Sequence, residues 1–309
     1  MTTAYISHND CALHDMGPEH PESPSRLAAI INQIQGTELE QMLEFVRAEE
    51  IQRVQLQRVH PEMYLHQLDL ISPERGRVMA DPDTIIMPHT LRAARLAAGA
   101  VSQGVDMVLS NQVTNAFCAV RPPGHHAERS KTMGFCFYNN IAVAACQALT
   151  FHHLERVAIV DFDVHQGNGT IDIFNDDPRV MVCSSFQHPY YPFSHYHNLG
   201  ENIVNVPLDA HTDGKTYRHR IERDWLPQLE TFKPQLILIS AGFDGHRLDP
   251  MAEMNLEDED YGWITERIVE IAEKHCNGRV VSSLEGGYHL EALARSVEAH
   301  LKALAGMKP

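Results

Sequence analysis

The chain has 309 residues, of which 43% are hydrophobic, and a formal net charge of −16. This length and composition suffice for a large buried core, whereas direct nucleic-acid binding depends on clustered Lys and Arg and is not expected from so acidic a chain. An acidic surface would instead attract cationic substrates, and because no run of about 18 apolar residues occurs, we expect no membrane span.

Short apolar runs alternate with amphipathic segments along the chain. The strand candidates are residues 4–7, 115–120, 157–162, 180–186, 203–206, 236–241 and 279–284, and the helix candidates are residues 25–34, 91–103, 139–149, 216–231, 258–275 and 290–304. Several strand candidates are nearly continuous in apolar residues, as expected for strands covered on both faces. The alternation predicts an α/β fold with a mostly parallel sheet and helices on both faces.

The chemically interesting residues follow the strand candidates. In chain order they are His125, His126, Asp163, His165, Asp244 and Tyr288. In open parallel sheets, ligands bind at the edge where the carboxyl ends of the strands lie. We therefore expect these residues to meet at one site.

Two adjacent histidines end the segment Arg-Pro-Pro-Gly-His-His at residues 121–126. The prolines and the glycine favour a rigid turn, so His125 and His126 could act as base for a metal-activated water and as acid for a leaving amine. Asp161 and Asn168 are the candidate partners, because a carboxylate raises the basicity of an imidazole whereas an amide only orients it. Taken alone, the dipeptide could also be a surface pair in a chain with 20 histidines.

A carboxylate and an imidazole one residue apart, Asp163 and His165, can point to the same side of an extended segment. Asp244 would add a second carboxylate from the end of another strand. Three protein ligands leave an open position, as in catalytic zinc sites, where the ion lowers the pKa of a water and polarises a carbonyl. On its own the short pattern also fits a turn-capping Asp163 and a loop His165; the other elements favour the metal site.

A tyrosine follows a Gly-Gly turn in the segment Ser-Leu-Glu-Gly-Gly-Tyr at residues 283–288. Glycines adopt backbone conformations that other residues resist, so the turn can direct Tyr288 into the site. There its phenol could donate a hydrogen bond to a developing oxyanion. A core tyrosine after a turn is the alternative for this segment alone.

The remaining features indicate a cytoplasmic protein. Six cysteines are scattered without a Cys-x-x-Cys pair, which is typical of reduced thiols. The N-terminal Met-Thr-Thr-Ala-Tyr lacks a basic segment followed by an apolar stretch, so we expect no secretory signal. Neither a repeat nor a low-complexity linker is present, and we expect one domain over residues 1–309.

Jointly, the motifs resemble the zinc-dependent histone deacetylase family, with its class II branch and its bacterial amidohydrolase and acetylpolyamine amidohydrolase relatives. The matching segments run in the family's order and cover nearly the whole chain: residues 20–26, 121–127, 134–140, 161–170, 240–244, 249–250 and 285–288. The resemblance implies a three-layer arginase/deacetylase-like fold around an eight-stranded, mostly parallel sheet.

The same resemblance implies roles for individual residues. The zinc ligands would be Asp163, His165 and Asp244. The catalytic residues would be His126 as general base and acid, Asn168 as its orienting partner, His125 with Asp161 as an electrostatic pair, and Tyr288 as the group that binds the acyl carbonyl. Since an Asp/His/Asp site admits zinc and ferrous iron, availability decides the metal.

The substrate channel is implied in less detail. Gly134 and Phe135 would line it, Met251 would lie at its mouth, and Asp83 aligns with a rim residue that holds a peptide backbone. Residues 189–198 read Pro-Tyr-Tyr-Pro-Phe-Ser-His-Tyr-His-Asn where many members have Tyr-Pro-Gly-Thr-Gly. This side of the rim is therefore bulkier and aromatic, and the sequence does not assign the second aromatic wall.

Family members also hold a structural potassium ion. The resemblance places it at backbone oxygens near Asp161, Asp163 and His165, with the hydroxyl of Ser185 and the neighbouring Phe186.

These expectations describe a metal-dependent deacetylase that hydrolyses the amide of N-acetyl or N-acyl lysine side chains. One alternative is an acetylpolyamine or other small-molecule amidohydrolase with the same chemistry, and another is an inactive acyl-lysine-binding module. A ureohydrolase of the arginase type would need a second metal and a second aspartate near Asp244, which residues 242–246 lack. The sequence leaves open the substrate, the acyl preference, the choice between zinc and iron, and the oligomeric state.

Overall fold

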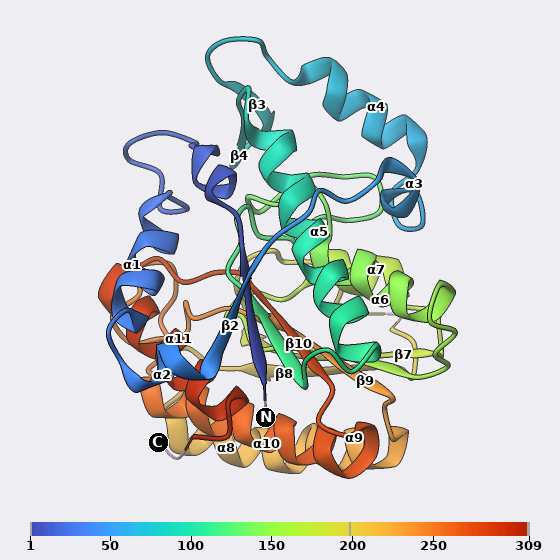
Figure 1. Cartoon of the computed structure of the whole chain (residues 1–309), viewed down its shortest axis with the longest axis vertical. Coiled ribbons are helices and arrows are strands. Elements are labelled where there is room, and N and C mark those ends of the chain that lie inside the picture. The colour runs from blue at the N-terminus through green and yellow to red at the C-terminus, as the bar shows by residue number, and fades with distance from the viewer. Residues whose placement is uncertain (1, 198, 308–309) are drawn as a thin grey trace.

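One parallel sheet forms the centre of the structure. Its strands are β1 (Thr3–Ser7), β2 (Leu43–Arg47), β5 (Asn115–Cys118), β6 (Val157–Asp161), β7 (Val180–Gln187), β8 (Ile203–Leu208), β9 (Leu236–Ala241) and β10 (Val280–Leu284). The computed structural model describes residues 2–197 and 199–307, and within them these eight strands pair in parallel in the order β2-β1-β5-β10-β9-β6-β7-β8 (Figure 1). The predicted α/β class with an eight-stranded parallel sheet is confirmed.

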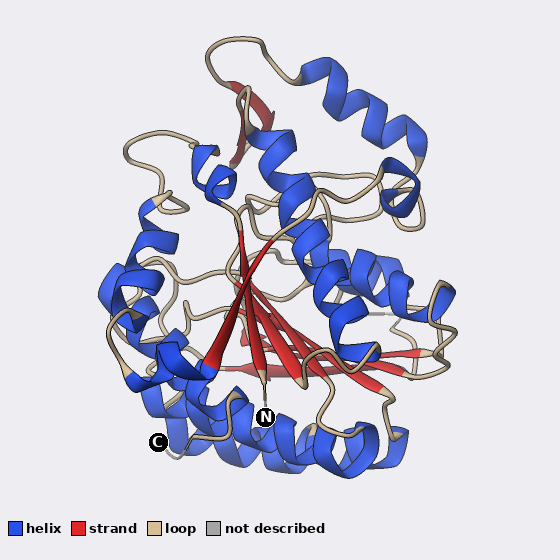
Figure 2. Cartoon of the chain, viewed as in Figure 1, coloured by secondary structure: helices blue, strands red, loops and turns tan. Residues whose placement is uncertain are grey.

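Helices cover both faces of the sheet (Figure 2). They are η1 (Asn9–Leu13), α1 (Ser25–Ile34), α2 (Glu38–Met42), α3 (Arg53–Leu56), α4 (Glu62–Ile71), α5 (Thr90–Leu109), α6 (Asn140–Thr150), α7 (Asn168–Phe174), α8 (Gly214–Asp224), α9 (Leu226–Phe232), α10 (Asp258–Cys276) and α11 (Leu290–Leu304). The apolar residues of α5 and α6 join one core with the sheet, and those of α1 and α8 to α11 join a second core on its other face. The three predicted layers are therefore present.

Strand β9 shows why the strands appear as continuous apolar runs in the sequence. Its six residues are all buried. Leu236 and Leu238 belong to one core, whereas Ile237 and Ile239 belong to the other. Successive side chains of a strand point to opposite faces, so both sets must be apolar when helices cover both faces.

The strand order brings the chemically interesting segments together. Strands β5, β10, β9 and β6 are consecutive neighbours in the sheet. Because all strands are parallel, the segments that follow these four leave the sheet at the same edge. Those segments contain the histidine pair, the Gly-Gly-Tyr turn and the three expected metal ligands. The site expected at the carboxyl ends of the strands is therefore assembled by the topology.

Two strand regions were not predicted from the sequence, and neither were the helices η1, α2, α3, α4 and α7. Edge strand β2 was not predicted, because its residues are mostly exposed and give no continuous apolar run. A small antiparallel hairpin of β3 (Val78–Asp81) and β4 (Thr84–Ile86) was also not predicted. This hairpin lies above the carboxyl-end edge of the sheet in Figure 1 and carries Asp83 in its turn.

The helix predicted over residues 216–231 is divided into α8 and α9. Trp225 both ends α8 and precedes α9, and Pro227 lies in the first turn of α9. Proline has no N–H to donate to the preceding turn and its ring clashes there, so a helix breaks before it.

Two findings bear on the cellular setting. Within the described residues, no helix combines the length and the apolarity that a membrane span requires. The six cysteines are free thiols, and all except Cys146 are buried.

Candidate active site

The three expected metal ligands lie together at the edge of the sheet. Nδ1 of His165 is 3.1 Å from Oδ1 of Asp163 and 3.1 Å from Oδ2 of Asp244. One ligand atom from each residue lies within 4.8 Å of the others, and all three residues are buried. The structure therefore brings the predicted trio into the arrangement that a single ion requires.

The electrostatics of this trio fit a bound cation. Burial and the negative charge of Asp163 raise the pKa of Asp244. Burial lowers the pKa of His165, but its contacts with Asp163 and Asp244 outweigh burial and raise that pKa to about 10. Two buried carboxylates thus require positive charge between them, and one nitrogen with two oxygens is a donor set that zinc or ferrous iron accepts.

Backbone groups hold both carboxylates in place. Oδ2 of Asp163 accepts a hydrogen bond from the amide of Gly286 at 2.8 Å, and Oδ1 of Asp244 accepts one from the amide of Val164 at 3.0 Å. A Cβ on Gly286 would lie 2.1 Å from Oδ2 of Asp244, and a Cβ on Gly242 would lie 2.0 Å from Oδ2 of Asp163. Only glycine fits at these two positions, because the carboxylates pack directly against the backbone.

The two histidines beside the trio have different partners. Nδ1 of His125 is 2.9 Å from Oδ2 of Asp161, and Nδ1 of His126 is 2.7 Å from Oδ1 of Asn168. The imidazole centroids are 4.0 Å apart, and both residues are buried. The pairing predicted from the sequence, one histidine with a carboxylate and the other with an amide, is present.

These partners give the histidines opposite pKa shifts. Burial lowers the pKa of His125, but Asp161 and Asp163 outweigh burial and hold it well above its usual value. Burial, followed by the positive charges of His125 and His165, holds the pKa of His126 well below its usual value. These shifts favour the charged form of His125 and the neutral form of His126.

The tautomer of His126 follows from the hydrogen bonds of Asn168. The amide nitrogen of Asn168 donates to Oε1 of Glu128 at 2.8 Å, so its oxygen is the atom that faces His126. Nδ1 of His126 must then donate to this oxygen, which leaves Nε2 without a proton. Asn168 is the first residue of α7, so a helix fixes its position.

Tyr288 is held through its backbone and its ring. Oδ2 of Asp249 accepts hydrogen bonds from the amides of Tyr288 at 2.6 Å and His289 at 3.0 Å, and Oδ1 accepts one from Met251 at 3.0 Å. The guanidinium carbon of Arg26 lies 5.0 Å from the centroid of the Tyr288 ring. Sequence reasoning did not give Asp249 a role; its signal was the Asp-Pro pair between Asp244 and Met251.

A cavity of about 280 Å³ leads to these residues. All four predicted substrate-binding residues line it: Asp83, Gly134, Phe135 and Met251. Tyr190, Tyr191 and Phe193 complete its wall, so the side that the sequence left unassigned is aromatic, as the composition of residues 189–198 indicated. Of that segment, residue 198 lies outside the described residues.

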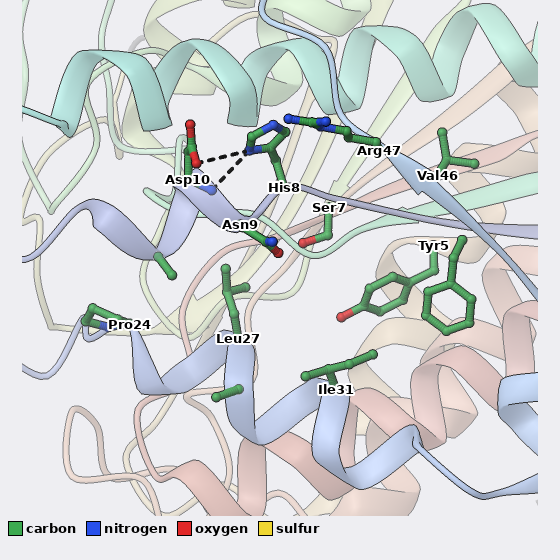
Figure 3. A pocket seen from close by; sticks show the side chains of 13 residues that line it. Tyr5, Ser7, His8, Asn9, Asp10, Pro24, Leu27, Ile31, Val46 and Arg47 are labelled. Atoms are coloured by element: carbon green, nitrogen blue, oxygen red, sulfur yellow. Dashed lines mark hydrogen bonds and ion pairs between the residues drawn. The ribbon is translucent and has the colours of Figure 1, made fainter.

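A larger hollow of about 730 Å³ lies elsewhere, beside β1, β2 and α1. Figure 3 shows it between the side chains of Tyr5, Leu27 and Ile31. None of the site residues predicted from the sequence lines it. The smaller cavity is therefore the one that matches the predicted chemistry.

The residues predicted for potassium lie on β6, on β7 and in the segment that follows β6. Oγ of Ser185 is 3.5 Å from the hydroxyl of Tyr217, and burial together with the charges of Asp260 and Asp161 raises the pKa of Tyr217. Ser184 pairs with Asp161 in the sheet, and among the described residues its buried Oγ has no hydrogen-bond partner. Neighbouring residues of a strand face opposite sides, so the hydroxyls of Ser184 and Ser185 lie on different faces of the sheet.

The comparisons with known proteins agree with this geometry. Residues 20–304 match the model of the histone deacetylase domain. An uncharacterised protein of Synechocystis sp. is 42% identical over 94% of this chain and 95% of its own length, and a probable deacetylase of Archaeoglobus fulgidus is 37% identical over 99% and 87%. The crystal structure of the HDA15 HD domain is 33% identical, with a TM-score of 0.93, over 99% of this chain and 88% of that one.

The chain therefore belongs to the histone deacetylase family, and its fold is the arginase/deacetylase fold. Its relatives include deacetylases and amidohydrolases, which supports hydrolase activity.

Proposed function

We propose that the protein is a metal-dependent deacetylase that hydrolyses the amide of N-acetyl or N-acyl lysine side chains. The observation that carries this proposal is the position of His126: its Nδ1 lies 2.7 Å from Oδ1 of Asn168, and its ring centroid lies 6.0 Å from that of the expected metal ligand His165 in an aromatic-lined cavity. A base, a cation site and a narrow channel at one place are what amide hydrolysis on an extended side chain requires.

Asp163, His165 and Asp244 would hold the ion, zinc or ferrous iron, as their charges and donor atoms fit. When bound, the ion supplies polarisation of the amide carbonyl and a lowered pKa for a water.

The proton transfers fall to the histidine pair. Nε2 of His126 takes a proton from the attacking water and then gives it to the nitrogen of the leaving amine. His125 remains positively charged beside Asp161 and disfavours a second positive charge on His126, so the proton that His126 accepts is readily passed on. His126 thus acts as both base and acid, and His125 lowers its pKa.

Tyr288 supplies a hydrogen bond to the acyl oxygen. Burial raises the pKa of its phenol well above the usual value of 10.0, so the group stays protonated at neutral pH and can only lose its proton at strongly alkaline pH. A fixed donor aimed at the oxygen on which negative charge develops stabilises the transition state more than the ground state.

The cavity favours an acyl-lysine over an acetylated polyamine. Its wall contains Phe135, Tyr191 and the neutral Met251, which suit a methylene chain. A polyamine carries a further cation, and Met251 at the mouth supplies no charge to select it. Acetylpolyamine hydrolysis remains the second candidate.

We also propose three features that accompany the activity. One catalytic domain spans residues 1–309, a structural potassium ion is bound near Asp161, and the protein acts in the cytoplasm. The potassium ion would be held by backbone oxygens near Asp161, Asp163 and His165, by Phe186 and by the hydroxyl of Ser185. The free cysteines support the cytoplasmic setting.

The test is a substrate panel of acetyl-lysine peptides, longer acyl-lysines and acetylated diamines, with metal content measured throughout. We expect His126→Ala to lower kcat by about 10²- to 10⁴-fold and Tyr288→Phe to lower it by about 10²- to 10³-fold, both with the metal retained. Near wild-type rates in either variant would show the mechanism to be wrong. Absence of turnover with zinc, iron and cobalt would favour an acyl-lysine-binding module, and a preference for diamines would favour the polyamine alternative.

A further inference from the structure

The turn of the β3–β4 hairpin connects two loops that both contribute residues to the lining of the cavity. On one side, the hydroxyl of Tyr191 donates a hydrogen bond to Oδ2 of Asp83 at 2.9 Å. On the other side, Oδ1 of Asp83 accepts a hydrogen bond from the amide of Gly134 at 3.0 Å. One carboxylate therefore joins the segment after β7 to the segment before α6.

The neighbouring threonine strengthens this connection. The hydroxyl of Thr84 donates to Oδ1 of Asp83 at 2.6 Å, and its oxygen accepts a hydrogen bond from the amide of Phe135 at 3.0 Å. Thr84 is fully buried, so the base of the hairpin turn is anchored in the protein. Phe135 has a positive φ of 69°, a conformation that a non-glycine residue adopts only when contacts of this kind hold it.

The two aromatic rings attached to this connection both line the cavity. The ring of Tyr191 stands edge-on to His126, with centroids 5.2 Å apart, and to His165 at 6.0 Å. The ring of Phe135 stands edge-on to Tyr288 at 6.0 Å. Each ring thus contacts residues of the reacting centre and lines the cavity that leads to it.

The hydrogen bond from Tyr191 to Asp83 holds the Tyr191 ring in place against the cavity. Neighbouring Phe193 is 70% exposed and gives Tyr191 little support, so apart from its edge-on contacts with His126 and His165 the ring depends on this hydrogen bond. A phenol that donates to a carboxylate makes a charge-assisted hydrogen bond, which is stronger than a neutral one. Without this bond the Tyr191 ring is free to rotate toward solvent and widen the cavity.

We propose that Asp83, Thr84 and Tyr191 form a brace that sets the width of the substrate channel and restricts it to amides of unbranched alkylamines. This inference rests on the proposed deacetylase function and names the specificity of the same site. In this arrangement three protein donors already occupy the Asp83 carboxylate, so the residue positions the walls of the channel.

The test compares two acetamides of similar size and different width, N-hexylacetamide and N-(cyclohexylmethyl)acetamide. The wild-type protein should prefer the hexyl amide. In Tyr191→Phe, which keeps the ring and removes only the hydroxyl, the ratio of the two kcat/KM values should fall by about tenfold, the scale on which a pocket discriminates one or two methylenes. Part of this fall should be a gain for the cyclohexylmethyl amide, which a damaged fold would not produce.

Matched variants separate the brace from general loosening of the rim. Tyr196→Phe removes a hydroxyl of the same segment that donates to the carbonyl of Tyr190 at 3.3 Å, and it should keep the wild-type ratio. Asp83→Ala should lower the ratio as Tyr191→Phe does, and the double variant should lower it no further, because both changes break one interaction. Asp83→Asn should lower it less, since the amide nitrogen can donate to the phenol oxygen.

The proposal would be overturned if Tyr191→Phe and Asp83→Ala both kept the wild-type ratio of the two kcat/KM values, or if the effects of the two changes were fully additive. Failure of the proposed function gives a different result: the wild-type protein would hydrolyse neither amide. Channel width also affects substrate binding. If the protein shows no turnover, the preference for the hexyl amide can therefore be measured as the ratio of the two Kd values. This preference should fall in Tyr191→Phe and in Asp83→Ala.

Discussion

The base of the cavity and its mouth are built by different parts of the chain. The base consists of residues that directly follow buried strands of one sheet, and the polar atoms of its metal ligands and histidines contact one another or buried amides. The mouth consists of a two-stranded hairpin and two loops, and its aromatic residues are half-buried or exposed. Neighbouring strands hold the base, whereas a few single hydrogen bonds hold the mouth.

This difference separates the residues that catalyse the reaction from those that select the substrate. Interactions made in the transition state depend on positions fixed to a fraction of an ångström, and the sheet supplies that rigidity at the base. Selection between substrates depends on the width and charge of the mouth, which a single side chain can alter. Substitutions at the base should therefore abolish turnover, while those at the mouth should redistribute it among substrates.

The largest expected effect is the loss of a metal ligand at the base. Asp244→Ala leaves one carboxylate and one imidazole, so we expect the ion to be lost and kcat/KM to fall by about 10³-fold or more, since metal catalysis contributes several kcal/mol. Metal analysis and turnover measure the two losses together. Asp224→Ala, which removes a carboxylate paired with Arg220 and Arg223, is the control and should retain both properties. Full metal content in Asp244→Ala would contradict the assigned ligand set.

A smaller effect is expected where the base meets the mouth. Asp249→Ala removes the acceptor of the Tyr288, His289 and Met251 amides. The Tyr288 phenol should then lose its fixed position, and kcat should fall by about 10- to 100-fold with the metal retained, since a displacement of about 1 Å can cost 10²-fold. Asp249→Asn keeps one acceptor oxygen, so its kcat should lie between that of Asp249→Ala and that of the wild type. An unchanged kcat in Asp249→Ala would show that the glycine turn and Arg26 position the tyrosine without it.

The base could be predicted from the sequence because each of its residues follows a strand that the sequence also reveals. Leu236 to Ile239 form an uninterrupted apolar run, and Asp244 comes shortly after it. Once the sheet is parallel, the carboxyl ends of its strands lie at one edge. The partners of His125 and His126 followed from the same argument, since Asp161 and Asn168 flank the ligands.

The mouth could not be predicted in this way, because hairpins and loops carry no long-range pattern. Nothing in the sequence around Asp83 indicates that its carboxylate contacts Tyr191, which lies 108 residues further along the chain. The two serines of β7 show a related limit: a shift of one residue along a strand reverses the face of every side chain, and the register of Ser184 and Ser185 against β6 cannot be read from the sequence.

The opposite pKa shifts of His125 and His126 allow a test of the electrostatics at the bottom of the cavity, with an effect smaller than the two above. The pKa of His126 lies below its usual value of 6.5, so this general base is neutral at neutral pH. The value of kcat/KM should therefore fall only as the pH drops below 6.5. Asn168→Asp places a negative charge at Nδ1, which stabilises the imidazolium and raises the pKa of His126. The acidic limb of the pH profile should therefore move to higher pH, with metal content unchanged. A limb that stays in place or moves to lower pH would contradict the role of His126 as the base.

The smallest effect is expected at the outermost residue of the mouth. Phe193 is 70% exposed and has a positive φ of 56°, so its ring makes few contacts while its backbone is strained. For a small acetyl amide, Phe193→Ala and Phe193→Gly should each change kcat/KM by about twofold or less, because exposed substitutions alter free energies by about 0.5 kcal/mol.

The same two variants separate the ring of Phe193 from its backbone. Both remove the ring, but only glycine adopts the left-handed conformation without strain, so Phe193→Gly should be the more stable by about 1 kcal/mol in urea unfolding. Equal stabilities would mean that the loop changes conformation when the ring is removed. A large loss of turnover in either variant would mean that Phe193 holds the Tyr191 wall, and the mouth would then be a packed structure like the base.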